Sequence, residues 1–258
     1  TVLFSDLWGF TGYSERYAPH EMITFLSEYF TRMSEKVFRH WGTLKEYVGD
    51  ELMAIFGAPL DQPDHAQRAC TTALDMRREL ALLRAEWARI GRPPLRARTG
   101  INSGPMLVGN LGSRYRFAYG ALGDNVNLGS RLEGLNREFG TEIIIGENTA
   151  EMVGDAFRLR ELDMVRVKGR RNAVRVYELL AKAGEALPQP VEQALGPYAA
   201  GLEAYRRMAW EGAALLFNRV LETNPEDGAS RTMIERCRRY RQMPPPTDWD
   251  GVFEMQTK

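Results

Sequence analysis

The stretch VLFSDLWGFTG, residues 2–12, sets the start of the fold. It begins as a β-type run up to Leu7, and two glycines then break that run. From Pro19 to Val37 apolar residues recur every three or four positions, which predicts a helix with one face packed on a core. The chain therefore opens with a strand, a turn and a helix, and Asp6 stands where the strand ends.

A hairpin is predicted next. The runs 43–48 and 52–56 are short and β-type, and Gly49-Asp50-Glu51 separates them. A sheet can aim one carboxylate from a strand end and another from a hairpin tip at the same point. Asp6 and Asp50 are therefore candidates to share divalent cations. The alternative is a pair of exposed turn aspartates, because Asp is common in turns.

The rest of the first 180 residues continues this alternation of strands and helices. The order strand, helix, hairpin, helix, strand is the βαββαβ order of a ferredoxin-like sandwich, so we expect an α+β fold with one mixed sheet. The further elements expected are a helix at 63–90, strands at 95–101, 106–108, 116–121 and 142–145, helices at 126–138 and 149–153, and a closing strand pair at 157–167 and 174–179.

The pattern divides the chain into residues 1–182, 183–197 and 198–258. The middle segment holds three prolines and two glycines with little apolar periodicity, so it is predicted to be a linker. The last segment is a small helical extension whose apolar spacing resembles one tetratricopeptide helix pair. One repeat buries little surface, so we expect this tail to dock on the first domain, on a protein partner or on segments outside the chain. The Arg-rich run 236–241 is interpreted as a solvated helix end.

Composition limits the function classes. The 258 residues include 34 Lys and Arg against 34 Asp and Glu, so bulk charge gives no reason to expect nucleic-acid binding. The two cysteines, Cys70 and Cys237, exclude a disulfide framework and favour a reducing, cytoplasmic setting. No apolar run is long enough to span a bilayer. Because the chain opens inside an apparent strand, we interpret it as part of a longer protein, which an upstream segment could anchor to a membrane.

Three later blocks extend the pattern of the two opening stretches. They are GPMLVG at 104–109, LGDNVNLGSRLE at 122–133 and VKG at 167–169. Together with residues 2–11 and 46–57, these blocks resemble the catalytic domain of class III nucleotidyl cyclases of the bacterial type. The blocks keep the family order over residues 1 to about 180.

The resemblance implies a cyclisation of a nucleoside triphosphate assisted by two Mg²⁺ or Mn²⁺ ions. Asp6 and Asp50 would hold the ions, with the backbone of Leu7 as a further contact. A triphosphate brings about four negative charges, so metal ions and cationic side chains are the main means of stabilising its reaction. The phosphate contacts are expected from the turn residues Gly9, Phe10 and Thr11 and from Lys168.

Asn127 and Arg131 are the candidate catalytic side chains. They are four residues apart, which puts them on one face of the predicted helix. By the resemblance, Asn127 orients the ribose and Arg131 meets the charge that grows on the α-phosphate. In the family, the metal aspartates come from one chain and this pair from the other. A head-to-tail symmetric homodimer is therefore expected as the active form.

By the same resemblance, the base-recognition positions are Glu46 and Gly120. A carboxylate only accepts hydrogen bonds, which suits the adjacent N1–H and amino donors of guanine, so Glu46 favours GTP and a guanylate cyclase. Gly120 has no side chain and does not discriminate. Lys45 points to the opposite strand face unless the register slips, and a slip would restore the lysine of adenylate cyclases. The alternatives are an adenylate cyclase using ATP and a catalytically silent regulatory or scaffold module.

Overall fold

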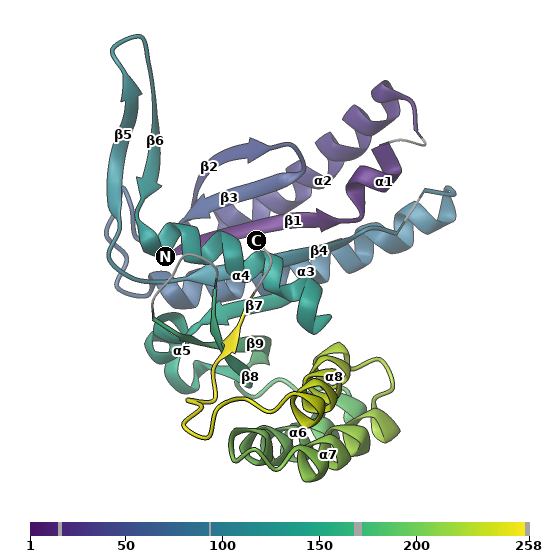
Figure 1. The fold of residues 1–258 in the computed structure, drawn as a ribbon. Coiled ribbons are helices and arrows are strands. Elements are labelled where there is room, and N and C mark those ends of the chain that lie inside the picture. Colours follow the sequence, from purple (N-terminus) through teal and green to yellow (C-terminus); the bar gives the residue numbers. More distant parts are fainter. Residues whose placement is uncertain (15–16, 93, 168–171, 256–258) are drawn as a thin grey trace.

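The computed structural model describes residues 1–14, 17–92, 94–167 and 172–255 of the chain. Within these ranges an eight-stranded mixed sheet has the strand order β10-β8-β9-β7-β4-β1-β3-β2, and β5 with β6 forms a separate hairpin (Figure 1). The strands are β1 (Val2–Trp8), β2 (Thr43–Val48), β3 (Glu51–Ile55), β4 (Arg96–Asn102), β5 (Leu107–Ser113), β6 (Arg116–Leu122), β7 (Ile143–Gly146), β8 (Phe157–Arg166), β9 (Val174–Lys182) and β10 (Phe253–Glu254).

Helices cover both faces of the sheet. The described helices are α1 (Phe10–Ser14), α2 (Pro19–Arg39), α3 (His65–Arg89), α4 (Asp124–Phe139), α5 (Glu147–Val153), α6 (Gln189–Arg206), α7 (Trp210–Thr223) and α8 (Gly228–Gln242), and a short 3₁₀ turn spans Gly154–Ala156.

The first half of the sheet has the predicted βαββαβ arrangement. Strand β1 pairs antiparallel with both β3 and β4, and β2 pairs antiparallel with β3. Helix α2 follows β1 and α3 follows β3, which gives the strand order β4-β1-β3-β2 of a ferredoxin-like sandwich. The α+β prediction is confirmed.

Side-chain alternation along β1 separates two cores. Leu3 and Leu7 are buried in the cluster that includes residues of α2 and α3, whereas Val2 and Phe4 are buried on the opposite face with a residue of α4. Because successive residues of a strand face opposite sides, Asp6 shares the α4 face with Val2 and Phe4. The fold therefore fixes the side of the sheet on which this carboxylate can act.

Gly100 allows β4 and α4 to approach closely. A Cβ atom at this position would lie 2.1 Å from the backbone N of Glu133 and 2.4 Å from the carbonyl oxygen of Gly129. No side chain fits there, so the glycine is what lets the helix lie directly against the strand. This contact brings the middle of α4 next to the strand that pairs with β1.

The hairpin of β5 and β6 projects from the body of the molecule (Figure 1). The predicted strands at 106–108 and 116–121 are both present, but β5 runs on to Ser113. Several large apolar side chains of this hairpin are exposed, namely Leu107, Tyr115, Phe117 and Leu122. The hairpin therefore presents apolar surface that its own chain leaves uncovered.

Helix α6 occupies much of the segment predicted to be a linker. It begins at Gln189, with Pro190 in its first turn and Pro197 inside it. A proline in the first turn of a helix lacks only an N–H group that has no helical partner anyway, so it is tolerated there. The linker prediction for 183–197 does not hold for the second half of that segment, because α6 begins at Gln189 and includes both Pro190 and Pro197.

The helical tail contacts the first domain through buried ion pairs. Arg236 of α8, predicted to be solvated, is only 4% exposed and donates to the buried Asp163 of β8 and, at 2.5 Å, to Glu138 of α4. Arg160 of β8 donates to Asp227, at 2.6 Å. The solvated interpretation of Arg236 was wrong, because this arginine lies on the face of α8 that turns toward the sheet.

The structure also describes the two cysteines and the apolar character of the helices. Cys70 and Cys237 are both free and buried. Among the described residues, no helix combines the length and the apolar character that a bilayer crossing needs.

Candidate active site

The two predicted metal aspartates lie together. In the antiparallel pairing of β1 with β3, Ser5 is opposite Leu52, so the end of β1 runs beside the β2–β3 turn that carries Asp50. The Asp6 carboxylate is close enough to Asp50 to raise its pKa, and hydrogen bonding from the backbone of Asp50 and Leu7 acts against this rise. A strand end and a hairpin tip thus bring two carboxyl groups near each other.

This point carries concentrated negative charge. Partial burial and then the neighbouring Asp6 carboxylate raise the pKa of Asp50 from 3.8 to about 6. Burial, Asp6 and Asp50 also raise the pKa of Glu51, the next residue. A cation bound beside Asp50 and Glu51 would therefore stabilise the ionised forms of both carboxylates.

Arg98 and Glu133 extend the cluster toward α4, and the sequence analysis did not single out either of them. Arg98 on β4 donates to Asp6 over 3.0 Å, and its Nε lies 3.0 Å from a carboxylate oxygen of Glu133. Burial raises the pKa of Glu133 to about 7, against the opposing effect of Arg98. The strand register could have indicated Arg98, because this residue is directly opposite Asp6.

The donor set at this point fits a divalent ion shared with a triphosphate. Over the ranges described, no group of three or more His, Cys, Asp or Glu side chains is arranged to hold a metal ion. Mg²⁺ does not require such a cage, because it usually takes one or two carboxylates and completes its shell with substrate phosphates and water. Asp6, Asp50 and the backbone of Leu7 supply that smaller set.

The expected phosphate turn adopts the predicted strand-to-helix form. Gly9 has a φ of +81°, and the one-turn helix α1 follows it directly. The side chain of Phe10 packs on the core cluster under α2 and α3, so its backbone is held in place. Thr11 lies within α1. Lys168 lies outside the described residues.

Asn127 and Arg131 both lie on α4, as predicted. Asn127 is exposed, and Arg131 is half-buried with its Nη1 atom enclosed and without a hydrogen-bond partner among the residues that the structure describes. In the described ranges, no hydrogen bond or ion pair joins these two side chains to Asp6 or Asp50. The candidate residues thus form two separate groups, one at the end of β1 and one on α4.

The base-recognition positions show a difference from the expected register. Strand β2 pairs Leu44 with Ala54 and then Glu46 with Met53, so Lys45 is the extra residue of a β-bulge. A Cβ atom at Gly120 would lie only 2.9 Å from Cε of Lys45, so the lysine side chain covers this glycine. Glu46 is exposed and pairs with Lys45. Lys45, which the sequence left as an alternative, is the side chain that meets Gly120.

Comparison with known proteins agrees with this arrangement. Residues 1–181 match the family model of the adenylate and guanylate cyclase catalytic domain. The chain belongs to this family. The matched residues 1–181 include every candidate site residue named above, whereas the helical tail lies outside the match.

Relatives of both base specificities are found. Adenylate cyclase 1 of Rhizobium meliloti is 37% identical over 70% of this chain, which spans 27% of that protein. A Dictyostelium discoideum adenylate cyclase specific to terminal differentiation is 32% identical over 92% of this chain, which spans 11% of that protein. The crystal structure of the guanylyl cyclase Cya2 is 35% identical with a TM-score of 0.65, covering 71% of this chain and 92% of its own. The adenylyl cyclase CyaB from P. aeruginosa is 33% identical with a TM-score of 0.66, covering 72% of this chain and 95% of its own.

Proposed function

We propose that this cyclase domain converts a purine nucleoside triphosphate into its 3′,5′-cyclic monophosphate and pyrophosphate. The observation that carries the proposal is the meeting of the Asp6 and Asp50 carboxyl groups at the end of β1. Divalent ions held there would lower the pKa of the ribose 3′-hydroxyl and neutralise the phosphates. Arg98 keeps Asp6 oriented, and the backbone N–H groups after Gly9 are available to phosphate oxygens.

The complete site is proposed to form between two copies of the chain. Asn127 would orient the ribose from α4 of the second copy, and Arg131 would stabilise the charge that develops on the α-phosphate. The enclosed, unpartnered Nη1 of Arg131 supports a role for this side chain beyond packing, because buried polar groups are normally paired. The exposed apolar side chains of the β5–β6 hairpin supply surface that a second copy could cover.

For the base, the sequence favoured GTP, and the geometry supplies an argument for ATP. The bulge at Lys45 puts an ammonium-bearing chain over Gly120, where it can donate to N1 of adenine. Glu46, the expected reader of guanine, is paired with that lysine. Several of the relatives are named adenylate cyclases, among them the two reported above. We therefore infer that ATP is the preferred substrate and that GTP is the second candidate.

Turnover assays test the reaction. The purified chain is incubated with ATP or GTP and either Mg²⁺ or Mn²⁺, and the product is identified by mass spectrometry. A cyclic monophosphate and pyrophosphate in equal amounts support the proposal. If neither nucleotide is cyclised by a chain that binds nucleotide and dimerises, the module is a silent regulatory or scaffold domain.

Variants at the bulge test the base preference. Lys45→Ala should lower kcat/KM for ATP about tenfold or more relative to GTP, because a donor to the base is lost, and Glu46→Ala should change the ratio much less. Arg89→Ala, an exposed change on α3, serves as the control. The opposite ranking, with Glu46→Ala impairing GTP turnover and Lys45→Ala without effect, would restore the guanylate cyclase assignment.

A further inference from the structure

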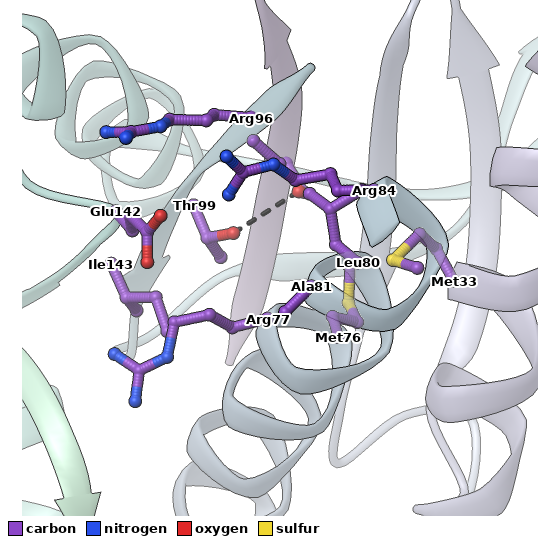
Figure 2. Close-up of a pocket in the computed structure, with 12 residues that line it drawn as sticks. Met33, Met76, Arg77, Leu80, Ala81, Arg84, Arg96, Thr99, Glu142 and Ile143 are labelled. Atoms are coloured by element: carbon purple, nitrogen blue, oxygen red, sulfur yellow. Dashed lines mark hydrogen bonds between the residues drawn. The ribbon is translucent and has the colours of Figure 1, made fainter. Parts of the chain in front are cut away.

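A cavity on the other face of the sheet carries more cationic than anionic side chains. It has a volume of about 70 Å³ and lies between α3, β4 and the start of β7. Figure 2 shows the side chains of Arg77 and Arg84 of α3 and Arg96 of β4 extending to the side where the carboxylate of Glu142 lies. Three guanidinium groups and one carboxylate thus line the cavity.

Two of the three arginines of this cavity form no ion pair with the described part of the chain. Arg77 donates to the carbonyl oxygens of Leu179 and Leu180, so it is fixed to β9. In the described part of the chain, Arg84 and Arg96 form no ion pair, and the Nε atom of Arg84 is enclosed without a hydrogen-bond partner. An enclosed guanidinium N–H without an acceptor is costly, so the Arg84 side chain favours a ligand that accepts hydrogen bonds, and Arg96 is available to the same ligand.

The size and charge of the cavity define the ligand. A water needs about 10–15 Å³ of such space, so the cavity admits about five non-hydrogen atoms. Three guanidinium groups suit an oxyanion, which they can hold by charge-assisted hydrogen bonds. Glu142 only accepts hydrogen bonds when ionised, so it would repel a bare anion but would accept from one that carries a proton. Hydrogen phosphate, with five non-hydrogen atoms and a P–OH group, meets each requirement.

The cavity lies behind the metal aspartate. Its floor includes the hydroxyl of Thr99, which donates to the hydroxyl of Ser5 over 3.2 Å (Figure 2). These two residues are paired in register, and the next pair along β1 and β4 is Asp6 with Arg98. Because successive side chains face opposite sides of a strand, the cavity and the metal site lie back to back across the sheet.

We propose that this cavity binds hydrogen phosphate and that its occupancy is coupled to turnover through the paired strands β1 and β4. Arg84 and Arg96 would bind the unprotonated oxygens, and Glu142 would accept from the P–OH group. Arg77 would add its charge while it remains tied to β9. The binding part is independent of the proposed function, whereas the coupling part rests on it.

Isothermal titration calorimetry with inorganic phosphate on the full chain, without metal or nucleotide, tests the binding. Arg84→Gln and Arg96→Gln should each weaken phosphate binding about tenfold or more, because a charge-assisted hydrogen bond is lost. Arg89→Gln, an exposed change on the same helix as Arg84, should leave the Kd within twofold. Equal phosphate affinity in wild type, Arg84→Gln and Arg96→Gln would overturn the site, and thermal unfolding confirms that each variant is folded.

Sulfate tests the assignment of Glu142. Sulfate has the size of phosphate but carries no proton at neutral pH, so wild type should prefer phosphate by about tenfold or more. Glu142→Gln should remove most of this preference, because the amide can donate to a bare oxygen. An equal affinity of wild type for both anions, or an unchanged preference in Glu142→Gln, would show that the carboxylate does not select the ligand.

The coupling is tested by kcat at saturating nucleotide and metal, with and without phosphate. A phosphate-dependent change of kcat that is present in wild type and Arg89→Gln but absent in Arg84→Gln supports it. The same change in all three proteins would mean that phosphate acts elsewhere, and no change would refute the coupling. A failure of the proposed function would appear as absent turnover in every protein, with the calorimetric result unaffected.

Discussion

Asp50 and Asp163 are both carboxylates whose pKa is raised to about 6 mainly by burial, and their partners differ. Asp163 lies under the helical tail and is bound by the guanidinium of Arg236. Asp50 lies beside the end of β1, and the neighbouring Asp6 carboxylate adds to the rise of its pKa. The fold thus pairs Asp163 with a cation of its own and places Asp50 beside a second carboxylate, where we propose that metal ions bind.

The contrast teaches how to separate structural from functional charge in this molecule. A buried ion pair costs desolvation but is internally matched, so its loss is seen in stability. A cluster that holds more carboxylates than cations destabilises the protein, and such clusters are found where a ligand supplies the compensation. Substitutions at Asp50 should therefore mainly affect turnover, and substitutions at Arg236 should mainly affect the free energy of unfolding.

The largest effect is expected from Asp50→Asn. Removing one carboxylate takes away part of the metal site, so turnover should fall at least about a thousandfold. The metal-free variant should at the same time unfold about 2 °C higher than wild type at pH 7.5, because the repulsion with Asp6 is relieved. Product formation and thermal unfolding measure the two properties.

A mixture of Asp50→Asn with a second variant, Arg131→Ala, provides the control. Asp50→Asn and Arg131→Ala should each be inactive, but a mixture of the two should regain up to about a quarter of wild-type activity if two chains share each site. Full Mn²⁺-dependent turnover by Asp50→Asn alone would contradict the metal role of Asp50. Inactive mixtures of folded, dimeric variants would contradict the shared site.

The second-largest effect is expected when the ion pair of Arg236 with Asp163 is broken. Arg236→Met leaves Asp163 buried without its cation, which should lower the free energy of unfolding by about 3–5 kcal/mol. The Tm should fall by about 10 °C, while turnover per folded molecule at low temperature should stay near that of wild type. Urea denaturation and product assays check these outcomes.

A double variant sharpens this test. Asp163→Leu combined with Arg236→Met replaces the pair by apolar side chains and should recover most of the lost stability. If Arg236→Met is as stable as wild type, the buried pair contributes nothing to the docking of the tail.

The sequence predicted the pair of carboxylates Asp6 and Asp50 but not the buried ion pair of Arg236 with Asp163. Asp6 and Asp50 could be found because a strand end and a hairpin tip are local features, and a carboxylate at each is visible in the sequence. Arg236 stands in a run with three other arginines, and composition alone marks the run as solvated. Only the helical spacing, three residues after the buried Met233, separates Arg236 from its exposed neighbour Arg238.

Backbone irregularities account for the other differences. The bulge at Lys45 changes which side chain of β2 covers Gly120, and no residue type in that strand predicts the bulge. Gly9 and the strand-to-helix turn were predictable, because a positive φ favours glycine. Arg98 and Glu133 come together only through the close approach of α4 at Gly100, which depends on tertiary packing and not on local pattern.

The smallest expected effect is the pH dependence of the stabilisation by Mn²⁺. The pKa of Asp50 is raised in the fold, so its protonated form is favoured there. Its contribution to stability is present below about pH 4 and is lost as the pH rises through 6. Metal ions need the ionised carboxylate, so Mn²⁺ at ten times its Kd should raise the Tm by about 3–5 °C at pH 7.5 and by much less at pH 5. Removing the ions with EDTA should reverse the rise, and Asp50→Asn should show little response at either pH. A rise of equal size at pH 5 and pH 7.5 in wild type would mean that Asp50 does not bind the ions, and the contrast with Asp163 would then have no functional meaning.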